Sequence, residues 1–439
     1  MNVVELLQQL IRNACVNDGT ATSGHEHRSV ATLVEYFGEQ GDIFEPAPGR
    51  QSLVYRIEGT DPDSPALALV PHLDVVPADA HGWSVDPFAG ETINGFIYGR
   101  GAIDMLNVSA AMAAAAKPYI NGEKTPRFDL ILAFVADEEA GGRYGASYLA
   151  ENHWDLVGAP YLLTEVAYPP PDLARDTIVP VAVGEKGVFW SSLVASGTPG
   201  HGSMPYGSDN ALAKLAVALE GLFTTPSPVA IGEEWERFVA DLDLASELAA
   251  ALVDPDHVDD AIEKLAEDDP RFAAYAHALT HLTISPNRVE GGTKTNIIAD
   301  KAKAEVDIRA LPGMDRDFVD SHLYKAMGSA RDEVEIVPMQ DLEATVSSTH
   351  NPLWEAIADS VEDMEGHRNL LPVMMTVGTD ARFWRRRGAT AYGVGLYDDK
   401  MTFSEMLGLF HGHDERVSIG SVERTTRLYE LILHHFAAE

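Results

Sequence analysis

The first part of the chain combines helical periodicity with fully apolar runs. Residues 2–17 and 27–40 have an amphipathic helical pattern, whereas residues 66–70 and 130–135 are apolar throughout. Apolar runs of this length between helices are typical of strands in a sheet that helices cover on both faces. The N-terminal part of the chain is therefore predicted to be an α/β layer.

The same pattern returns near the C-terminus. After about residue 343 we expect a helix at 352–362, a buried strand at 389–394 and a closing helix at 421–436. This part of the chain is predicted to complete the α/β layer, in which we also expect strands at 52–58 and 160–164.

The stretch between these two parts has a different pattern. Residues 188–196 alternate apolar and polar side chains, as expected of a strand with one solvated face. A helix at about 209–223 is followed by strands at about 282–285, 302–309 and 333–337, with a second helix between the last two strands. We therefore predict an α/β domain of residues 1–185 and 343–439 with an α+β domain of residues 186–342 inserted in it.

Charge restricts the partners of this protein. The 439 residues include 68 acidic and 32 basic side chains, a formal net charge of −36. Nucleic acids and anionic membranes are disfavoured, because both need a basic surface. The sequence contains no apolar run of about 18 residues, the length that is needed to span a bilayer. Residues 233–269 carry 14 acidic and two basic side chains and are predicted to form a solvated helical excursion, at about 227–280, within the inserted domain.

Several common chemistries are absent from the sequence. Cys15 is the only cysteine, so neither an intrachain disulfide nor a cysteine-rich zinc site is expected. The motifs H-E-x-x-H, G-x-S-x-G, G-x-x-x-x-G-K-[ST] and G-x-G-x-x-G do not occur. The first residues lack the basic start and apolar core of a signal peptide, so we expect a cytoplasmic protein.

A histidine and an aspartate follow the apolar run 66–70. In an extended segment the side chains of His72 and Asp74 point the same way. The Asp74 carboxylate can then accept a hydrogen bond from one ring nitrogen of His72, while the other nitrogen faces outward. Metal-binding histidines usually have such a partner, although a purely structural His–Asp pair has the same pattern.

Acidic residues stand at three further points of the predicted sheet. Asp104 lies at the turn into an Ala-rich helix, where helix capping and metal binding explain it equally well. Adjacent carboxylates at 137–139 follow strand 130–135 and repel one another unless a cation compensates them. Glu165 follows the strand at 160–164. Open α/β sheets bind ligands at the carboxyl ends of their strands, so we expect these groups to gather there.

Two more imidazoles, of His411 and His413, stand near the C-terminus. Together with the acidic residues they provide enough nitrogen and oxygen ligands for two divalent ions. A ligand set without thiolate suits zinc, cobalt or manganese.

These motifs, in this order over nearly the whole chain, resemble the family of di-zinc metallopeptidases that includes aminoacylase, acetylornithine deacetylase, succinyl-diaminopimelate desuccinylase and glutamate carboxypeptidase. The resemblance implies a zinc-peptidase-like catalytic domain with a mostly parallel mixed sheet between helices. It further implies that one zinc is held by His72, Asp104 and Glu165, and the other by Asp104, Glu139 and His411, with Asp104 bridging. Asp74 would orient His72, and Glu138 would be the general base. The family's H-x-x-[ND]-E pattern selects His411 over His413.

The inserted domain also matches this family, in which it is ferredoxin-like and serves as a lid and for dimerisation. The resemblance implies that His201, within Gly200-His201-Gly202-Ser203, polarises the scissile carbonyl and commonly reaches across a dimer. Asn296 and Arg309 would bind the carboxylate of the substrate, and the segment around Gly378 would line the pocket. A Lys-Gly that often follows the metal-bridging motif is replaced here by Leu106-Asn107.

We therefore predict a metal-dependent amidohydrolase with two zinc ions per chain, for which cobalt or manganese could substitute. Its substrate would be an N-acyl amino acid or a short peptide with a carboxylate beside the scissile amide. A dipeptidase or carboxypeptidase of the same family is the alternative. A non-catalytic ligand-binding relative is a more remote one, since Glu138 and every ligand position are filled.

Overall fold

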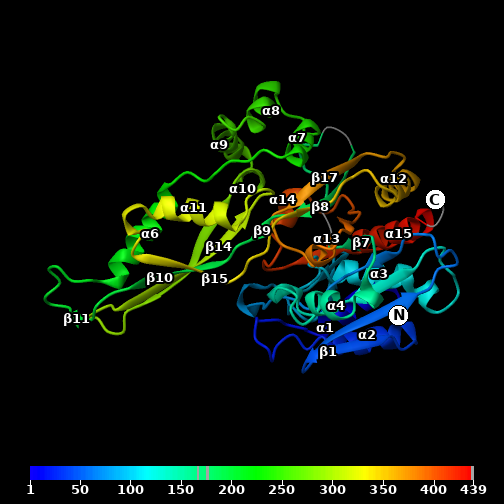
Figure 1. Ribbon diagram of the computed structural model, residues 1–439. Helices are drawn as coiled ribbons and strands as arrows, with labels where there is room; N and C mark the ends of the chain where they lie inside the picture. Colours follow the sequence, from blue (N-terminus) through cyan, green and yellow to red (C-terminus); the bar gives the residue numbers. More distant parts are fainter. Residues whose placement is uncertain (166–167, 175–176, 437–439) are drawn as a thin grey trace.

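The computed structural model describes residues 1–165, 168–174 and 177–436, which form a large and a small sheet with their helices (Figure 1). The large mixed sheet has the order β1 (Asp42–Ala47), β2 (Arg50–Ile57), β6 (Leu130–Phe134), β3 (Leu67–Leu69), β7 (Tyr161–Thr164), β18 (Thr390–Val394), β8 (Val179–Glu185) and β16 (Thr345–Val346). Strand β17 (Leu370–Met375) also pairs with β8. The neighbours β6, β3, β7 and β18 run parallel, so their carboxyl ends meet at one edge.

Successive residues of the central strands enter two different cores. Leu130, Leu132 and Phe134 of β6 pack with one set of helices, and Ile131 and Ala133 with another. The first set is α1 (Val3–Arg12), α2 (His27–Phe37), α3 (Leu106–Ile120), α12 (Pro352–Glu365) and α15 (Ile419–His435); the second is α4 (Ala146–Asn152), α5 (Trp154–Val157) and α13 (Ala381–Arg385). The apolar runs of the sequence thus form a sheet covered on both faces.

The small sheet is antiparallel, in the order β12 (Thr283–Gly291), β14 (Lys301–Ala310), β10 (Ser191–Ser196) and β15 (Val334–Pro338), with β9 (Gly187–Val188) beside β14. Helices α6 (Ala211–Thr224) and α11 (Arg316–Met327) share its apolar core. The chain order of strand, helix, two strands, helix and strand is that of a ferredoxin-like domain. This confirms the predicted fold class.

At the far end of the small domain, β11 (Gly200–His201) pairs with β13 (Ile297–Ile298) to form a two-stranded tip (Figure 1). A separate three-stranded sheet, β19 (Arg416–Ser418), β5 (Phe96–Tyr98) and β4 (Glu91–Ile93), joins the C-terminal region to the segment before Asp104.

The acidic stretch forms four helices, as its spacing predicts: α7 (Glu233–Ala240), α8 (Ser246–Leu252), α9 (Val258–Asp268) and α10 (Pro270–Thr280). They lie within the inserted segment by sequence, yet their buried side chains belong to the core of the large domain. Trp235 and Phe238 of α7 and Phe272 of α10 join that core, in which Phe272 also contacts Phe403 of α14 (Phe403–Leu407). The chain therefore returns to the large domain between α6 and β12.

Four strands of the large sheet, β1, β8, β16 and β17, lie outside the predicted ones. Strands β8 and β17 are buried and pair with each other, with Pro180 and Pro372 inside them. Proline is uncommon in central strands because it donates no ladder hydrogen bond, so the pattern does not indicate strands there. None of the helices in the described ranges combines the length and apolar character needed to cross a bilayer.

Candidate metal centre and substrate pocket

The side chains predicted to carry chemistry gather at the carboxyl ends of the parallel strands. His72 follows β3, Glu138 and Glu139 follow β6, and Glu165 follows β7. Ligand atoms of His72, Glu138 and Glu165 lie within 4.8 Å of one another, and so do those of His72, Asp104 and Glu139. The edge that the strand pattern predicts as a ligand site is therefore where these groups meet.

Asp104 lies between two imidazoles. One carboxylate oxygen, Oδ1, is 3.3 Å from Nε2 of His72, and the other, Oδ2, is 3.2 Å from Nε2 of His411. His411 Nε2 is also 3.4 Å from Oε2 of Glu139. Helix α3 begins at Leu106 with Met105 at its N-cap, so the capping interpretation of Asp104 is wrong. The side chain is free to face both histidines.

A buried ion pair holds the loops of Asp104 and His411 together. Arg100 Nη1 donates to Oε2 of Glu415 at 2.5 Å, and its Nη2 donates to the carbonyl oxygen of His411 at 3.0 Å. The second Glu415 oxygen accepts the backbone N–H of Ile103 at 2.9 Å. These contacts bring His411, and not His413, beside the carboxylates; His413 is exposed and lies against Gly82.

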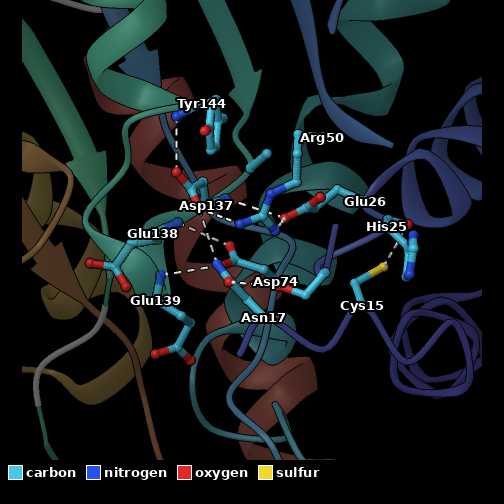
Figure 2. A network of polar contacts seen from close by, with 12 residues as sticks. Cys15, Asn17, His25, Glu26, Arg50, Asp74, Asp137, Glu138, Glu139 and Tyr144 are labelled. Atoms are coloured by element: carbon cyan, nitrogen blue, oxygen red, sulfur yellow. Dashed lines mark hydrogen bonds and ion pairs between the residues drawn. The ribbon is translucent and has the colours of Figure 1, made fainter. Parts of the chain in front are cut away.

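Asp74 acts differently from the sequence-based expectation. The Nδ1 atom of His72 bonds the backbone carbonyl of Asp74 at 3.0 Å, whereas the carboxylate Oδ1 is 3.7 Å away. The Asp74 carboxylate instead accepts the backbone N–H groups of Glu138 at 3.1 Å and Glu139 at 3.2 Å (Figure 2). The predicted side-chain pair is therefore wrong, because the carboxylate is used to hold the following turn.

The carboxylates of Asp137, Glu138 and Glu139 do not all point the same way. Asp137 adopts a left-handed backbone conformation, with φ of 70°. Its side chain points away from those of Glu138 and Glu139 and contacts Arg50 (Figure 2). The expected mutual repulsion is thus avoided for Asp137 by a protein cation, and only Glu138 and Glu139 face the pocket.

Burial and mutual repulsion shift the pKa values of the groups at this site. Burial raises the pKa of Glu138 well above its usual range, and the carboxylates of Glu165 and Asp380 add to the effect. Burial likewise raises the pKa of Glu165. Burial disfavours the charged form of His72, but the hydrogen bond with Asp104 and the surrounding carboxylates outweigh it and raise the pKa of His72. The site contains more buried carboxylates than protein cations to compensate them.

The donor set fits divalent metal ions. The described atoms include no hydrogen-bond partner for Oε1 of Glu139 or Oε1 of Glu165, although both atoms are buried. Buried carboxylate oxygens without a donor cost free energy unless a cation approaches them. Imidazole and carboxylate ligands without thiolate are those of zinc, cobalt and manganese.

A pocket of about 480 Å³ opens over this cluster. Arg309 and Gly378, both predicted from the sequence, line it together with Asp104, Glu138, Glu139, Glu165 and His411. Arg309 donates to Asp307 at 2.7 Å through Nε and lies over the ring of Trp190 at 5.7 Å. Arg382, in the segment around Gly378, also lines the pocket, although no role was predicted for it. Its guanidinium is buried in the pocket wall, with no hydrogen-bond partner for Nε among the described atoms.

His201 and Asn296 lie elsewhere. His201 is in β11 and Asn296 directly precedes β13, so both are at the tip of the small domain (Figure 1). Both side chains are exposed, and neither residue lines the pocket. Within one chain the structure therefore does not bring these two residues to the metal cluster.

Residues 68–435 match the sequence profile of peptidase family M20/M25/M40. The chain belongs to this family. Membership identifies it as a metallohydrolase that acts on amide or peptide bonds, and implies a dinuclear metal site, for which the His/Asp/Glu cluster is present.

The relatives of this chain within the M20 family are named after different substrates. Human aminoacylase-1 is 27% identical over 400 residues, covering 90% of this chain and 85% of its own. Human N-fatty-acyl-amino acid synthase/hydrolase PM20D1 is 26% identical over 417 residues, covering 92% and 80%. An M20 family metallo-carboxypeptidase from Sulfolobus solfataricus has the same fold, with a TM-score of 0.76 at 18% identity and complete coverage of both chains.

Proposed function

We propose that this protein hydrolyses the amide bond of an N-acyl amino acid, or of a short peptide, that carries a carboxylate beside the scissile amide. The observation that carries the proposal is that Arg309 lines the same pocket as Glu138 and the candidate metal ligands. A guanidinium binds a carboxylate through paired hydrogen bonds, and the otherwise acidic site offers few other groups that attract an anion. The names of the relatives at 26–27% identity support the N-acyl amino acid.

Two sets of residues would hold the metal ions. One set is His72, Asp104 and Glu165, and the other is Asp104, Glu139 and His411, with Asp104 shared. Bound zinc, or cobalt or manganese in its place, supplies Lewis-acid activation of a water molecule and of the scissile carbonyl. The distances from Asp104 to both imidazoles support its place as the shared ligand.

Glu138 moves the proton in this proposal. Its carboxylate oxygen takes a proton from the attacking water and then donates it to the nitrogen of the leaving amine. Burial beside Glu165 and Asp380 raises the pKa of Glu138. Asp74 positions Glu138 by accepting its backbone N–H.

Recognition of the substrate would come from the pocket wall. Arg309 binds the substrate carboxylate. Gly378 allows the backbone to pass close to the guanidinium of Arg382, since a Cβ atom at position 378 would lie 2.8 Å from Nη1 of Arg382. Asn296 would add a contact to the same carboxylate from a second copy of the chain. A carboxypeptidase or dipeptidase places a free carboxylate in the same position, so it is the alternative for the same pocket.

A homodimer through the small domain would complete the site. His201 would then stabilise the oxyanion that forms on the carbonyl oxygen in the partner's pocket. The tip carries exposed apolar side chains, with Met204 at 72% and Tyr206 at 103% exposure, and α6 exposes Leu212, Val217 and Phe223. Exposed apolar surface of this kind marks association sites, which supports dimerisation.

The test is a panel of N-acetyl amino acids, N-succinyl amino acids, N-fatty-acyl amino acids and dipeptides, assayed with zinc- or cobalt-loaded protein. Glu138→Gln and a chelated sample serve as controls. Hydrolysis that is lost in both controls supports the proposal, and the best substrate separates aminoacylase from peptidase. Absence of hydrolysis across the panel, with two metals bound, would refute the proposed substrate class.

A further inference from the structure

A buried network of charged groups lies beneath the metal centre. Arg50, the first residue of β2, donates from Nη1 to Oε1 of Glu26 at 2.7 Å and from Nη2 to Oδ1 of Asp137 (Figure 2). The three side chains are 1%, 0% and 2% exposed, respectively. Buried charges at this depth are stable only when they are paired and hydrogen-bonded, so the three positions are strongly interdependent.

Asn17 extends this network to Asp74. Its Nδ2 atom donates to Oδ2 of Asp74 at 2.8 Å and to Oδ1 of Asp137 at 3.2 Å. One amide group and one guanidinium thus separate three buried carboxylates, those of Glu26, Asp74 and Asp137. Without these donors the carboxylates would repel one another in a medium that screens charge poorly.

The backbone leaves room for Arg50 at one point. Gly24 has φ of +86°, and a Cβ atom at this position would lie 1.6 Å from Nη1 of Arg50. The loop that precedes α2 therefore passes against the guanidinium with no space for a side chain. Such a close approach fixes the place of the guanidinium as well as its partners.

The network ends at the turn that carries Glu138 and Glu139. Asp137 is held on two sides, because Arg50 and Asn17 donate to Oδ1 and the backbone N–H of Tyr144 donates to Oδ2 at 2.9 Å (Figure 2). The backbone N–H groups of Glu138 and Glu139, the two residues after Asp137, donate to the carboxylate of Asp74. The left-handed conformation of Asp137 sends its side chain to Arg50 and the following two side chains to the pocket.

We propose that Arg50 is a positioning residue for the metal centre: by binding Glu26 and Asp137 together, it holds the turn that presents Glu138 and Glu139. This inference rests on the proposed function for the roles of Glu138 and Glu139. Lysine cannot replace Arg50, because a single ammonium lacks the planar fork that reaches two carboxylates on different sides. Displacement of the turn moves Glu139 away from Asp104 and His411, while the backbone carbonyl of Asp74 still supports His72.

The test compares two arginines of the same strand. Arg50→Lys is matched by Arg56→Lys, since Arg56 pairs with Asp129 at 2.7 Å and both groups are about one third exposed or less, at 28% and 31%. Apo-protein is titrated with Co²⁺ and followed by visible absorption and calorimetry, which resolve the two binding steps. We expect Arg50→Lys to weaken one step by about 10- to 100-fold and leave the other within about threefold, as for other groups that orient metal ligands. Arg56→Lys should leave both steps unchanged.

Activity adds a second readout that a purely structural role would not move. In Arg50→Lys loaded with excess Co²⁺, kcat should fall while KM stays near that of wild type, because the pocket wall with Arg309 is untouched. Equal Co²⁺ affinities in Arg50→Lys and wild type, or an equal loss at both steps, would overturn the proposal.

A second variant covers the case in which Arg50→Lys does not fold. Asn17→Ala removes the amide between Asp74 and Asp137 but leaves the ion pairs in place. The same step of Co²⁺ binding should weaken, by a smaller factor, and unchanged binding would contradict the inference. A wild-type protein that binds two Co²⁺ ions but hydrolyses no amide would refute the proposed function alone, since the binding comparison still decides the role of Arg50.

Discussion

Replacement of His201 by alanine tests whether two copies of the chain share one active site. His201 lies at the exposed tip of the small domain, outside the pocket that contains Glu138. If each chain worked alone, the change would leave turnover unaltered. If the tip completes the pocket of a second copy, the change removes one donor to the developing oxyanion, which lowers kcat by about 10²- to 10³-fold.

Mixing two inactive variants makes the test quantitative. In an equal mixture of His201→Ala and Glu138→Gln with free subunit exchange, about half of the dimers contain one chain of each kind. Each mixed dimer has one pocket with intact Glu138 and an intact His201 from the other chain. About a quarter of all pockets are then complete, so the mixture should recover about a quarter of the wild-type rate.

The assay is the initial rate at saturating substrate, measured before and after exchange, with subunit mixing verified by mass spectrometry. His257→Ala is the matched control, because His257 is also exposed but lies in the turn between α8 and α9. Wild-type kcat in His201→Ala would refute shared sites. So would a mixture that contains mixed dimers but remains as inactive as its components.

Further predictions concern the pocket, the pH dependence and a buried ion pair. Arg309→Lys should lower kcat/KM by about 10- to 100-fold, mainly through KM, because a charge-assisted hydrogen bond contributes about 1.5–3 kcal/mol; Arg288→Lys, on the exposed part of the same sheet, should have no effect in the same kinetic assay. Burial lowers the pKa of the stacked His277 and His281, and the positive charge of Lys186 adds to this effect, so below pH 6.5 the unfolded chain binds protons that the folded chain does not and stability falls. The decrease in melting temperature from pH 7.5 to 5.5 should therefore be smaller in His277→Gln than in wild type, and equal decreases would contradict this. Glu185→Leu leaves the buried Arg385 without its carboxylate and should cost about 3–5 kcal/mol in urea unfolding, whereas Glu185→Gln, which keeps an acceptor, should cost clearly less.

Chain order and strand ends make most of the metal centre predictable. His72, Glu138, Glu139 and Glu165 each follow a mostly apolar strand, and parallel strands bring their carboxyl ends to one edge. Which atom of Asp74 supports His72 could not be predicted. That choice depends on the φ and ψ angles of a loop and on two backbone N–H groups from the turn after β6.

Arg50 and Asn17 show another limit of sequence reasoning. Each lies far along the chain from Asp137, and a lone arginine at the start of a strand has the same pattern whether it is exposed or buried. Only the packing of three segments shows that it sits among carboxylates. Similarly, β8 and β17 are strands because tertiary contacts outweigh the local effect of Pro180 and Pro372.

The packing of helices α7–α10 determines which segments of this protein can be removed or exchanged as a unit. The chain passes between the two cores four times: between Glu185 and Gly187, Thr224 and Glu233, Thr280 and Thr283, and Pro338 and Thr345. A gene fragment for the whole inserted segment would expose the apolar side chains of Trp235, Phe238 and Phe272 to water. The large domain without this segment would have β17 uncovered, because α7 packs on that strand. The exchangeable module is therefore discontinuous. Chimaeras between relatives should keep the helical block with the large domain and join the two flanking pieces of the small domain around it.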